Sequence, residues 1–488
     1  MNKCVLRALG FSAALLLLTA CGGGGSSATS TVALTPPLIR LVNAGVDAPA
    51  LTVAAIGSSS TSLIFSGLDF GSPTALQHQA ADSYEIKFSA ILPDNSTQTI
   101  ADQTGIALTT DNETSVYLAG SIADGSTREL VVNRPLVDVP SDKTELQVVH
   151  AASRAPAVSV YVTGTGDALD NAKPIADLSF PSAGTPVNLA SGSYRIRVTA
   201  QGDPNTVYFD TGQADAIALA GGASLQLSLI DNTGAGSAPV RVLLLDGRNT
   251  AQPFQLLSDP AAPVRLRVIN ASPDAGSIDL YASATGSGFS GSPQIAKLAY
   301  GSAQTLCSFA AGDDDFEATA AGAGAASPLP GLTLTNQTLT GGSIHALVAL
   351  GRVGGQPAAA LGLGSLDERP IFTEADLHFI HGAPALGAVN IYVTPAGSVS
   401  DAQIQAGGVT PTVLAFQPGQ LGGDLRFMPG SYDIRVADAT SNAIDVEQTG
   451  VNLGAGLRQT LTLLGADESG SGGPQQATLL VLATGECP

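Results

Sequence analysis

Short segments in which apolar and polar residues alternate recur along the chain, and three of them are nearly the same. The three segments are Ser83–Phe88 (SYEIKF), Ser193–Val198 (SYRIRV) and Ser431–Val436 (SYDIRV). Side chains alternate between the two faces of a strand, so Tyr84, Tyr194 and Tyr432 are predicted to point into a core while the charged residues face water. The pattern predicts three equivalent β-strands.

A second pattern precedes each of these strands and occurs four times. A strand-like segment runs into Asn or His, then a small-residue turn, then a second strand. The four copies are Leu41–Ala54, Val148–Tyr161, Val268–Tyr281 and Phe379–Tyr392, with the Asn or His at Asn43, His150, Asn270 and His381. The copies are 107, 120 and 111 residues apart. Solenoid units are about 20 to 50 residues long, so this period indicates tandem domains.

Short strands, glycine-rich turns and no long helical periodicity predict an all-β protein with four tandem immunoglobulin-like antiparallel β-sandwich domains. About 100 residues per copy suits a seven-stranded unit. Polar and proline-containing segments separate the copies. The predicted domains are residues 38–136, 144–249, 263–364 and 374–486.

The third copy departs from the strand pattern. It carries Gly312–Glu317 (GDDDFE), with Asp314 where the other copies have tyrosine. This repeat has therefore lost a core aromatic residue or shifted its register. The run Asp313–Asp315 lacks the spaced oxygen ligands of a calcium loop, so a solvated acidic hairpin is the favoured interpretation.

The N-terminal segment has the pattern of a signal peptide. Lys3 and Arg7 precede an apolar stretch, Leu9–Leu18, and Leu18–Cys21 reads LTAC. This segment is too short to span a bilayer stably. The LTAC sequence resembles the lipobox of bacterial lipoproteins, which implies cleavage after residue 20 and acylation of Cys21; an ordinary secretory signal is the alternative.

Residues 21–37 would then form a lipidated cysteine and a flexible tether, rich in Gly and Ser at first and in Pro at its end. Because Gly22 follows the cysteine, and not the Asp that retains lipoproteins at the inner membrane, the resemblance implies a cell-envelope protein anchored through lipid to the outer membrane. We therefore expect the membrane to be one partner of the chain.

The composition fits an extracellular β protein. Charged residues make up 13% of the chain, and the formal net charge is −20. Loss of Lys3 and Arg7 with the signal would make it −22. Nucleic acid is therefore not an expected partner, because its binding needs clustered Lys and Arg.

Four cysteines leave one potential disulfide. Cys4 belongs to the signal and Cys21 to the lipid anchor, so only Cys307 and Cys487 can pair. An oxidising compartment permits this bond. Because the two residues lie in different repeats, two unpaired thiols are the favoured expectation.

The segment Val148–Tyr161 (VVHAASRAPAVSVY), together with Gly192-Ser193-Tyr194, resembles a bacterial family of domains of unknown function, numbered 4397. The resemblance extends over nearly all of the chain after the signal, although the first copy has Asn43 and Thr52 where the family favours His and Asp. It implies tandem copies, an envelope location and a sandwich-like fold, and it supplies no catalytic residues.

The repeated Asn or His could take part in catalysis only with a partner residue. The residue nine positions later is Thr52, Ser159, Asp279 or Asn390, and no copy has both an imidazole and a carboxylate. General base catalysis needs a titratable group held by such a partner. Asn and His can both hydrogen-bond backbone groups, so a structural role is favoured over a catalytic one.

No metal or cofactor is expected. His378 and His381 form an H-x-x-H sequence, but residues three apart on a strand point to opposite faces. The chain also lacks the G-x-S-x-G and H-E-x-x-H motifs of hydrolases.

Three functional hypotheses remain. The favoured one is a non-catalytic, lipid-anchored repeat array for surface display or for binding an envelope or extracellular protein. The second is a glycan-binding lipoprotein, against which stand the absence of Trp and an aromatic content of 5%. An envelope hydrolase is the third and would need a cleft with convergent carboxylates or histidines.

Overall fold

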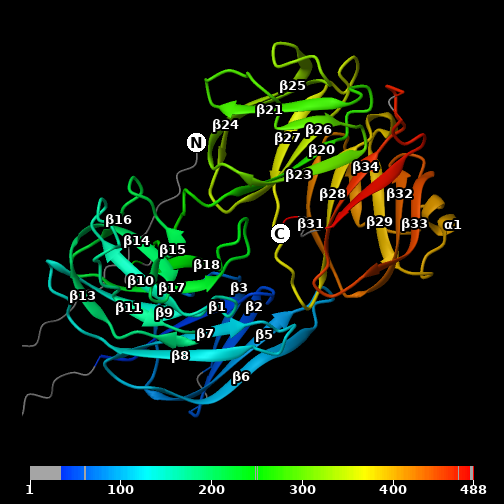
Figure 1. The fold of residues 1–488 in the computed structure, drawn as a ribbon. Coiled ribbons are helices and arrows are strands. Elements are labelled where there is room, and N and C mark those ends of the chain that lie inside the picture. Colours follow the sequence, from blue (N-terminus) through cyan, green and yellow to red (C-terminus); the bar gives the residue numbers. More distant parts are fainter. Residues whose placement is uncertain are drawn as a thin grey trace, which may run out of the picture. The chain divides into compact units, whose positions relative to one another are not determined.

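In the computed structural model, eight β-sheets follow one another in four pairs along the chain (Figure 1). The structure describes residues 35–59, 62–247, 249, 251–470, 472–483 and 487. The predicted signal peptide and Cys21 lie outside these residues. Residues Pro36–Pro488 form one compact unit by their contacts. Among the described residues, no helix is long and apolar enough to cross a membrane.

The first pair of sheets has the strand orders β4-β1-β7-β8 and β3-β2-β5-β6. Its strands are β1 (Leu38–Gly45), β2 (Leu51–Gly57), β3 (Ser62–Leu68), β4 (Gln77–His78), β5 (Asp82–Ile91), β6 (Thr97–Leu108), β7 (Asn112–Gly120) and β8 (Arg128–Pro135). Residues from both sheets, among them Leu41, Val53 and Phe88, form one buried core. We call this pair sandwich 1.

Sandwich 2 follows the same plan with additional short strands. Its strands are β9 (Lys143–His150), β10 (Val158–Thr163), β11 (Ala176–Leu178), β12 (Ser182–Ala183), β13 (Val187–Ala190), β14 (Gly192–Ala200), β15 (Asp203–Asp210), β16 (Ile217–Leu219), β17 (Ser224–Asp231), β18 (Val240–Asp246) and β19 (Phe254–Leu256). One sheet has the order β12-β9-β17-β18-β19, with β13 also paired to β9. The other has the order β11-β10-β14-β15, with β16 paired to β14.

Sandwiches 3 and 4 have the strand orders of sandwich 1. Sandwich 3 contains β20 (Val264–Asn270), β21 (Ile278–Ala284), β22 (Ile295–Leu298), β23 (Ser302–Phe309), β24 (Gly312–Ala320), β25 (Pro328–Leu339), β26 (Ile344–Leu350) and β27 (Ala360–Ser365). Sandwich 4 contains β28 (Ala375–Gly382), η1 (Pro384–Leu386), β29 (Val389–Pro395), α1 (Asp401–Gln405), β30 (Val413–Phe416), β31 (Leu421–Phe427), β32 (Gly430–Asp438), β33 (Ile444–Leu453), β34 (Arg458–Leu464) and β35 (Thr478–Ala483). The prediction of an all-β chain of repeated sandwiches is confirmed, and the predicted domain boundaries stay predictions.

One strand pair in every sandwich is parallel. The parallel pairs are β1 with β7, β9 with β17, β20 with β26, and β28 with β34. A parallel pair needs a long connection between its strands. Here the connection contains the whole second sheet. One sheet of each sandwich is therefore mixed, where purely antiparallel sheets were expected, and the second sheet is antiparallel.

The strands that form these parallel pairs are buried on both faces of their sheets. The strand β17 (SLQLSLID) is buried at every residue, whereas β5 alternates between buried and partly or fully exposed residues. The outer face of this sheet in sandwich 1 packs on its counterpart in sandwich 2, in a cluster that includes Val42, Tyr117 and Ile230. An equivalent cluster joins sandwiches 3 and 4 and includes Ile269, Val348 and Ile380. The sandwiches are therefore stacked in two pairs.

Candidate functional site

The repeated Asn or His makes the same hydrogen bond in all four sandwiches. It lies at or near the end of the first strand, is fully buried, and contacts the carbonyl oxygen six residues downstream. The contacts are Asn43 Nδ2 to Pro49 at 3.1 Å, His150 Nε2 to Pro156 at 3.1 Å, Asn270 Nδ2 to Gly276 at 2.8 Å and His381 Nε2 to Gly387 at 2.8 Å. This residue therefore closes the turn between the first two strands.

The hydrogen bond made by Nδ1 of His381 indicates the protonation state of this side chain. Its Nδ1 accepts the backbone N–H of Ala383 at 3.3 Å, as Asn43 Oδ1 accepts the N–H of Gly45 at 3.1 Å. A ring that accepts at Nδ1 and donates from Nε2 is a neutral imidazole. Burial lowers the pKa of His381 to about 4, and it also lowers the pKa of His150. His381 thus donates and accepts in the manner of an amide, whereas His150 shares only the Nε2 contact.

The residue nine positions further on holds other parts of the backbone. Asp279 accepts the N–H groups of Lys297 and Gly322, each at 2.7 Å. The amide oxygen of Asn390 accepts the N–H of Ala415 at 2.9 Å. These bonds fasten the third strand of the sandwich and a neighbouring loop, so the described geometry gives this position a structural role.

The three predicted core tyrosines occupy equivalent positions. Each hydroxyl donates to the carbonyl oxygen four residues upstream: Tyr84 to Ala80 at 3.2 Å, Tyr194 to Ala190 at 2.8 Å, and Tyr432 to Met428 at 2.8 Å. Tyr84 is buried, whereas Tyr194 and Tyr432 are half-buried. The hydroxyl thus ties the start of the strand to the preceding turn.

Sandwich 3 keeps the register of this strand and lacks the aromatic ring. The residue two positions before the tyrosine pairs with a leucine in every sandwich. The pairs are Asp82 with Leu108, Gly192 with Leu219, Gly312 with Leu339 and Gly430 with Leu453. Asp314 therefore stands at the tyrosine position itself, which decides between the two alternatives that the sequence left open.

Cys307 and Cys487 form a disulfide, with their Cα atoms 5.6 Å apart. The sequence favoured two unpaired thiols because the residues are 180 positions apart. The correction follows from the stacking of sandwiches 3 and 4, which brings Cys307 of β23 close to Cys487. Nearby, Arg267 donates to the carbonyl oxygen of Ala483 at 2.9 Å.

A buried ionic cluster joins sandwiches 1 and 2, and the sequence analysis did not anticipate it. Glu113 accepts hydrogen bonds from Arg40 at 3.1 Å and from Arg134 at 2.8 Å, and all three residues are at most 3% exposed. Arg134 also donates to the carbonyl oxygen of Leu225 in β17, at 3.1 Å. The sign of it in the sequence is a charged residue on each of β1 and β7. Charged residues on a strand ordinarily indicate a face that is exposed to water, so this sign did not predict a buried cluster.

His378 and His381 lie on opposite faces of β28, as expected. His378 contacts Asp424, with Nδ1 3.3 Å from the carboxylate, while His381 is bonded to Gly387 inside the sandwich. Within the described residues, no group of three or more His, Cys, Asp or Glu is arranged to hold a metal ion.

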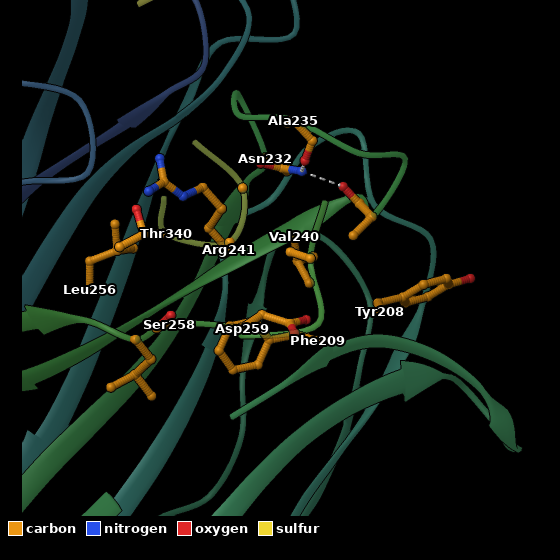
Figure 2. Close-up of a pocket in the computed structure, with 15 residues that line it drawn as sticks. Tyr208, Phe209, Asn232, Ala235, Val240, Arg241, Leu256, Ser258, Asp259 and Thr340 are labelled. Atoms are coloured by element: carbon orange, nitrogen blue, oxygen red, sulfur yellow. Dashed lines mark hydrogen bonds between the residues drawn. The ribbon is translucent and has the colours of Figure 1, made fainter. Parts of the chain in front are cut away.

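A pocket of about 230 Å³ lies where sandwich 2 meets the β25–β26 turn of sandwich 3 (Figure 2). Phe209, Val240 and Leu257 line its apolar part, and Arg241 and Asp259 are its charged residues. The backbone N–H of Ala235 donates to the carbonyl oxygen of Gly342 at 2.8 Å, which joins the two sandwiches beside the pocket.

The guanidinium of Arg241 is the main polar feature of this pocket. It forms no salt bridge with a described residue, although the charge of Asp367 acts on it. Burial lowers the pKa of Arg241, and Asp367 partly offsets this effect. Asp259 is held by the backbone N–H groups of Asp210 and Ala261. A half-buried cation beside apolar walls suits a ligand group that carries a negative charge.

Comparisons with known proteins identify a family and no function. No curated protein matches the chain. Among solved structures, the chain is similar to one described as "The Bacillus anthracis TIE protein", with 9% identity over 85% of this chain and 68% of that one and a TM-score of 0.14. This likeness is too weak to support an argument.

The family comparison agrees with the repeat motifs. The model described as "Domain of unknown function (DUF4397)" matches residues 37–161 and 264–392, which together make up just over half of the chain. Each matched region begins at or just before the first strand of one sandwich and continues through the second strand of the next. The chain belongs to the DUF4397 family of domains of unknown function.

Proposed function

We propose that this protein is a non-catalytic, lipid-anchored cell-envelope protein whose stacked sandwiches present a fixed surface to a protein partner. The observation that carries the proposal is the burial, on both faces, of the central strands of one sheet in each sandwich. This stacking leaves the β3-β2-β5-β6 sheet and its counterparts to face outward. Their long strands β6, β25 and β33 are mostly exposed or half-buried.

Stacking favours display because it fixes the sandwiches of each pair. Packed apolar clusters join the partners, and an ionic cluster or a disulfide reinforces each junction. A surface that is already ordered loses little conformational entropy on binding. This is the property expected of a scaffold or an adhesion module.

The repeated histidines support a non-catalytic assignment. His150 and His381 are buried, and each has its Nε2 at a backbone carbonyl oxygen. Asn43 and Asn270 make the same contact, and an amide cannot serve as a general base. The shared role of these residues is to close a turn.

We place the partner contact at the pocket of Figure 2, which Arg241 lines together with apolar side chains. A partner side chain or chain terminus that bears a carboxylate would fit this combination. A glycan ligand has less support, because six of the nine tyrosines are at most 5% exposed and therefore belong to cores or junctions.

Crosslinking in cells tests the interaction. The tagged full-length chain is crosslinked and its neighbours are identified by mass spectrometry, with Arg241→Gln as the pocket variant and Lys173→Gln, at an exposed lysine, as the charge-matched control. We expect one envelope protein to be captured by the wild type and the control and lost with Arg241→Gln. Capture of the same background neighbours by all three chains would contradict the proposal.

Lipid attachment is tested separately, because the display role requires an anchor. Metabolic labelling with a clickable fatty acid should mark the wild-type chain, and Cys21→Ala should abolish the label and release the protein from the membrane fraction. Density-gradient separation should place the labelled chain in the outer membrane. An unlabelled, secreted wild-type protein would show that residues 1–20 act as an ordinary secretory signal.

A further inference from the structure

Asp314 occupies a place that the other three sandwiches fill with a phenol ring. Tyr84, Tyr194 and Tyr432 each close this corner and donate to a carbonyl oxygen four residues upstream. In sandwich 3 the corresponding carbonyl belongs to Ala310, and no described residue donates to it. Replacement of a tyrosine by an aspartate at an unchanged register removes ring volume without moving the strand.

The removed volume remains open. A hollow of about 470 Å³ at this corner opens to solvent; Ala282, Leu306, Phe309 and Ala310 belong to its apolar part, and Gln294, Ser308 and Asp314 are among its polar residues. Its walls thus combine apolar side chains with the carbonyl and the carboxylate of the tyrosine position. The ring of Phe309 is also packed against Phe316 of the core, with ring centroids 5.9 Å apart. Such a wall suits an aromatic ring.

The carboxylate of Asp314 is the one member of the acidic run that is available to a ligand. Asp313 accepts the hydroxyl of Thr338 at 2.6 Å. Asp315 accepts the N–H groups of Gly286 and Asn336 at 3.0 and 2.8 Å. Asp314 is half-buried and makes no hydrogen bond or salt bridge with a described residue. Burial and the two neighbouring carboxylates raise its pKa, which a bound cation would reverse.

We propose that sandwich 3 binds a small aromatic amine at this corner. Its ring lies in the space that tyrosine fills in the sister sandwiches, and its ammonium group donates to the Asp314 carboxylate. The apolar walls would contact the ring of the ligand, and the unpaired carboxylate would bind its ammonium group. This site is separate from the pocket at Arg241, and the inference does not depend on the proposed display function.

Calorimetric titration of the purified full-length chain with tyramine tests the inference, with p-cresol as the ring alone and propylamine as the amine alone. We expect one tyramine site, with both fragments at least about tenfold weaker because each lacks one of the two interactions. Asp314→Tyr should abolish binding by refilling the corner, and its hydroxyl should reach the carbonyl of Ala310. Asp313→Asn should bind as the wild type does.

The isosteric variant Asp314→Asn keeps the test decisive if Asp314→Tyr does not fold. It should weaken tyramine binding at least about tenfold and leave p-cresol binding unchanged, because only the charge is lost. Absence of tyramine binding by the wild type would overturn the inference. Equal tyramine affinity in the wild type and in either Asp314 variant would also overturn it.

Discussion

Asn43 and His381 perform the same task with different chemistry: each contacts the carbonyl oxygen six residues downstream, at 3.1 and 2.8 Å. Each also accepts the backbone N–H two residues downstream. In these two repeats the position uses one donor and one acceptor at a fixed spacing, and both a primary amide and a neutral imidazole provide them. The exchange of Asn and His among the repeats is therefore explained without any reaction.

The first prediction concerns substitution at this position. His381→Asn should retain both hydrogen bonds and change the free energy of unfolding little, because Asn43 and Asn270 already occupy the equivalent site. His381→Ala should destabilise the chain by about 1–3 kcal/mol, since it leaves a buried carbonyl and a buried N–H without partners. Urea denaturation of the two variants measures the difference. Equal losses for both would contradict the proposed exchange.

The second prediction is a pH dependence with a defined sign. The folded chain lowers the pKa of His381 to about 4, from 6.5 for the unperturbed side chain. Between these values the unfolded chain binds a proton that the folded chain does not, so stability is complete above pH 6.5 and is lost as the pH falls toward 4. The loss approaches about 3 kcal/mol.

Comparison of the wild type with His381→Asn isolates this effect, because other titrating groups contribute equally to both. The stability of the wild type should fall relative to the variant as the pH is lowered from 7 to 4. Parallel curves over that range would show that His381 takes up its proton in the folded state as readily as in the unfolded state.

The sequence predicted the elements that depend on local pattern. Period-two alternation placed Tyr84, Tyr194 and Tyr432 on strands, and the repeated Asn or His placed the preceding turns. These features are visible because they rest on neighbouring residues and recur in several copies. The parallel pairing of β1 with β7 could not be found in this way, because the paired strands are separated by the entire second sheet.

Contacts between sandwiches also could not be predicted from the sequence. Arg40 looks like an ordinary exposed residue of an alternating strand, but it is 1% exposed and bonded to Glu113. Cys307 and Cys487, which are 180 residues apart, pair because sandwiches 3 and 4 stack. A pattern of residues along one strand reports that a face is polar, and it does not report which other sheet covers that face.

The third prediction tests the ionic cluster between sandwiches 1 and 2. Glu113→Gln should destabilise the chain by about 3–5 kcal/mol, because it leaves Arg40 and Arg134 buried without a counter-charge. The matched control is Glu468→Gln, which breaks a more exposed pair with Arg352 and should cost less than about 1 kcal/mol. Denaturant titration measures both. Similar losses for the two variants would mean that the Glu113 cluster is effectively hydrated.

The last prediction concerns the disulfide that closes 180 residues of chain around sandwiches 3 and 4. A crosslink of this span restricts the unfolded chain strongly, and loop-closure entropy gives an upper value of about 5 kcal/mol for its stabilisation. Reduction should therefore lower the melting temperature of the wild type, while Cys307→Ser should melt at the lower temperature with or without reductant. Peptide mapping without reduction should recover Cys307 linked to Cys487. Quantitative alkylation of both cysteines in the folded, unreduced protein would contradict the bond, and it would leave the apolar cluster around Ile269 and Val348 to hold sandwiches 3 and 4 together.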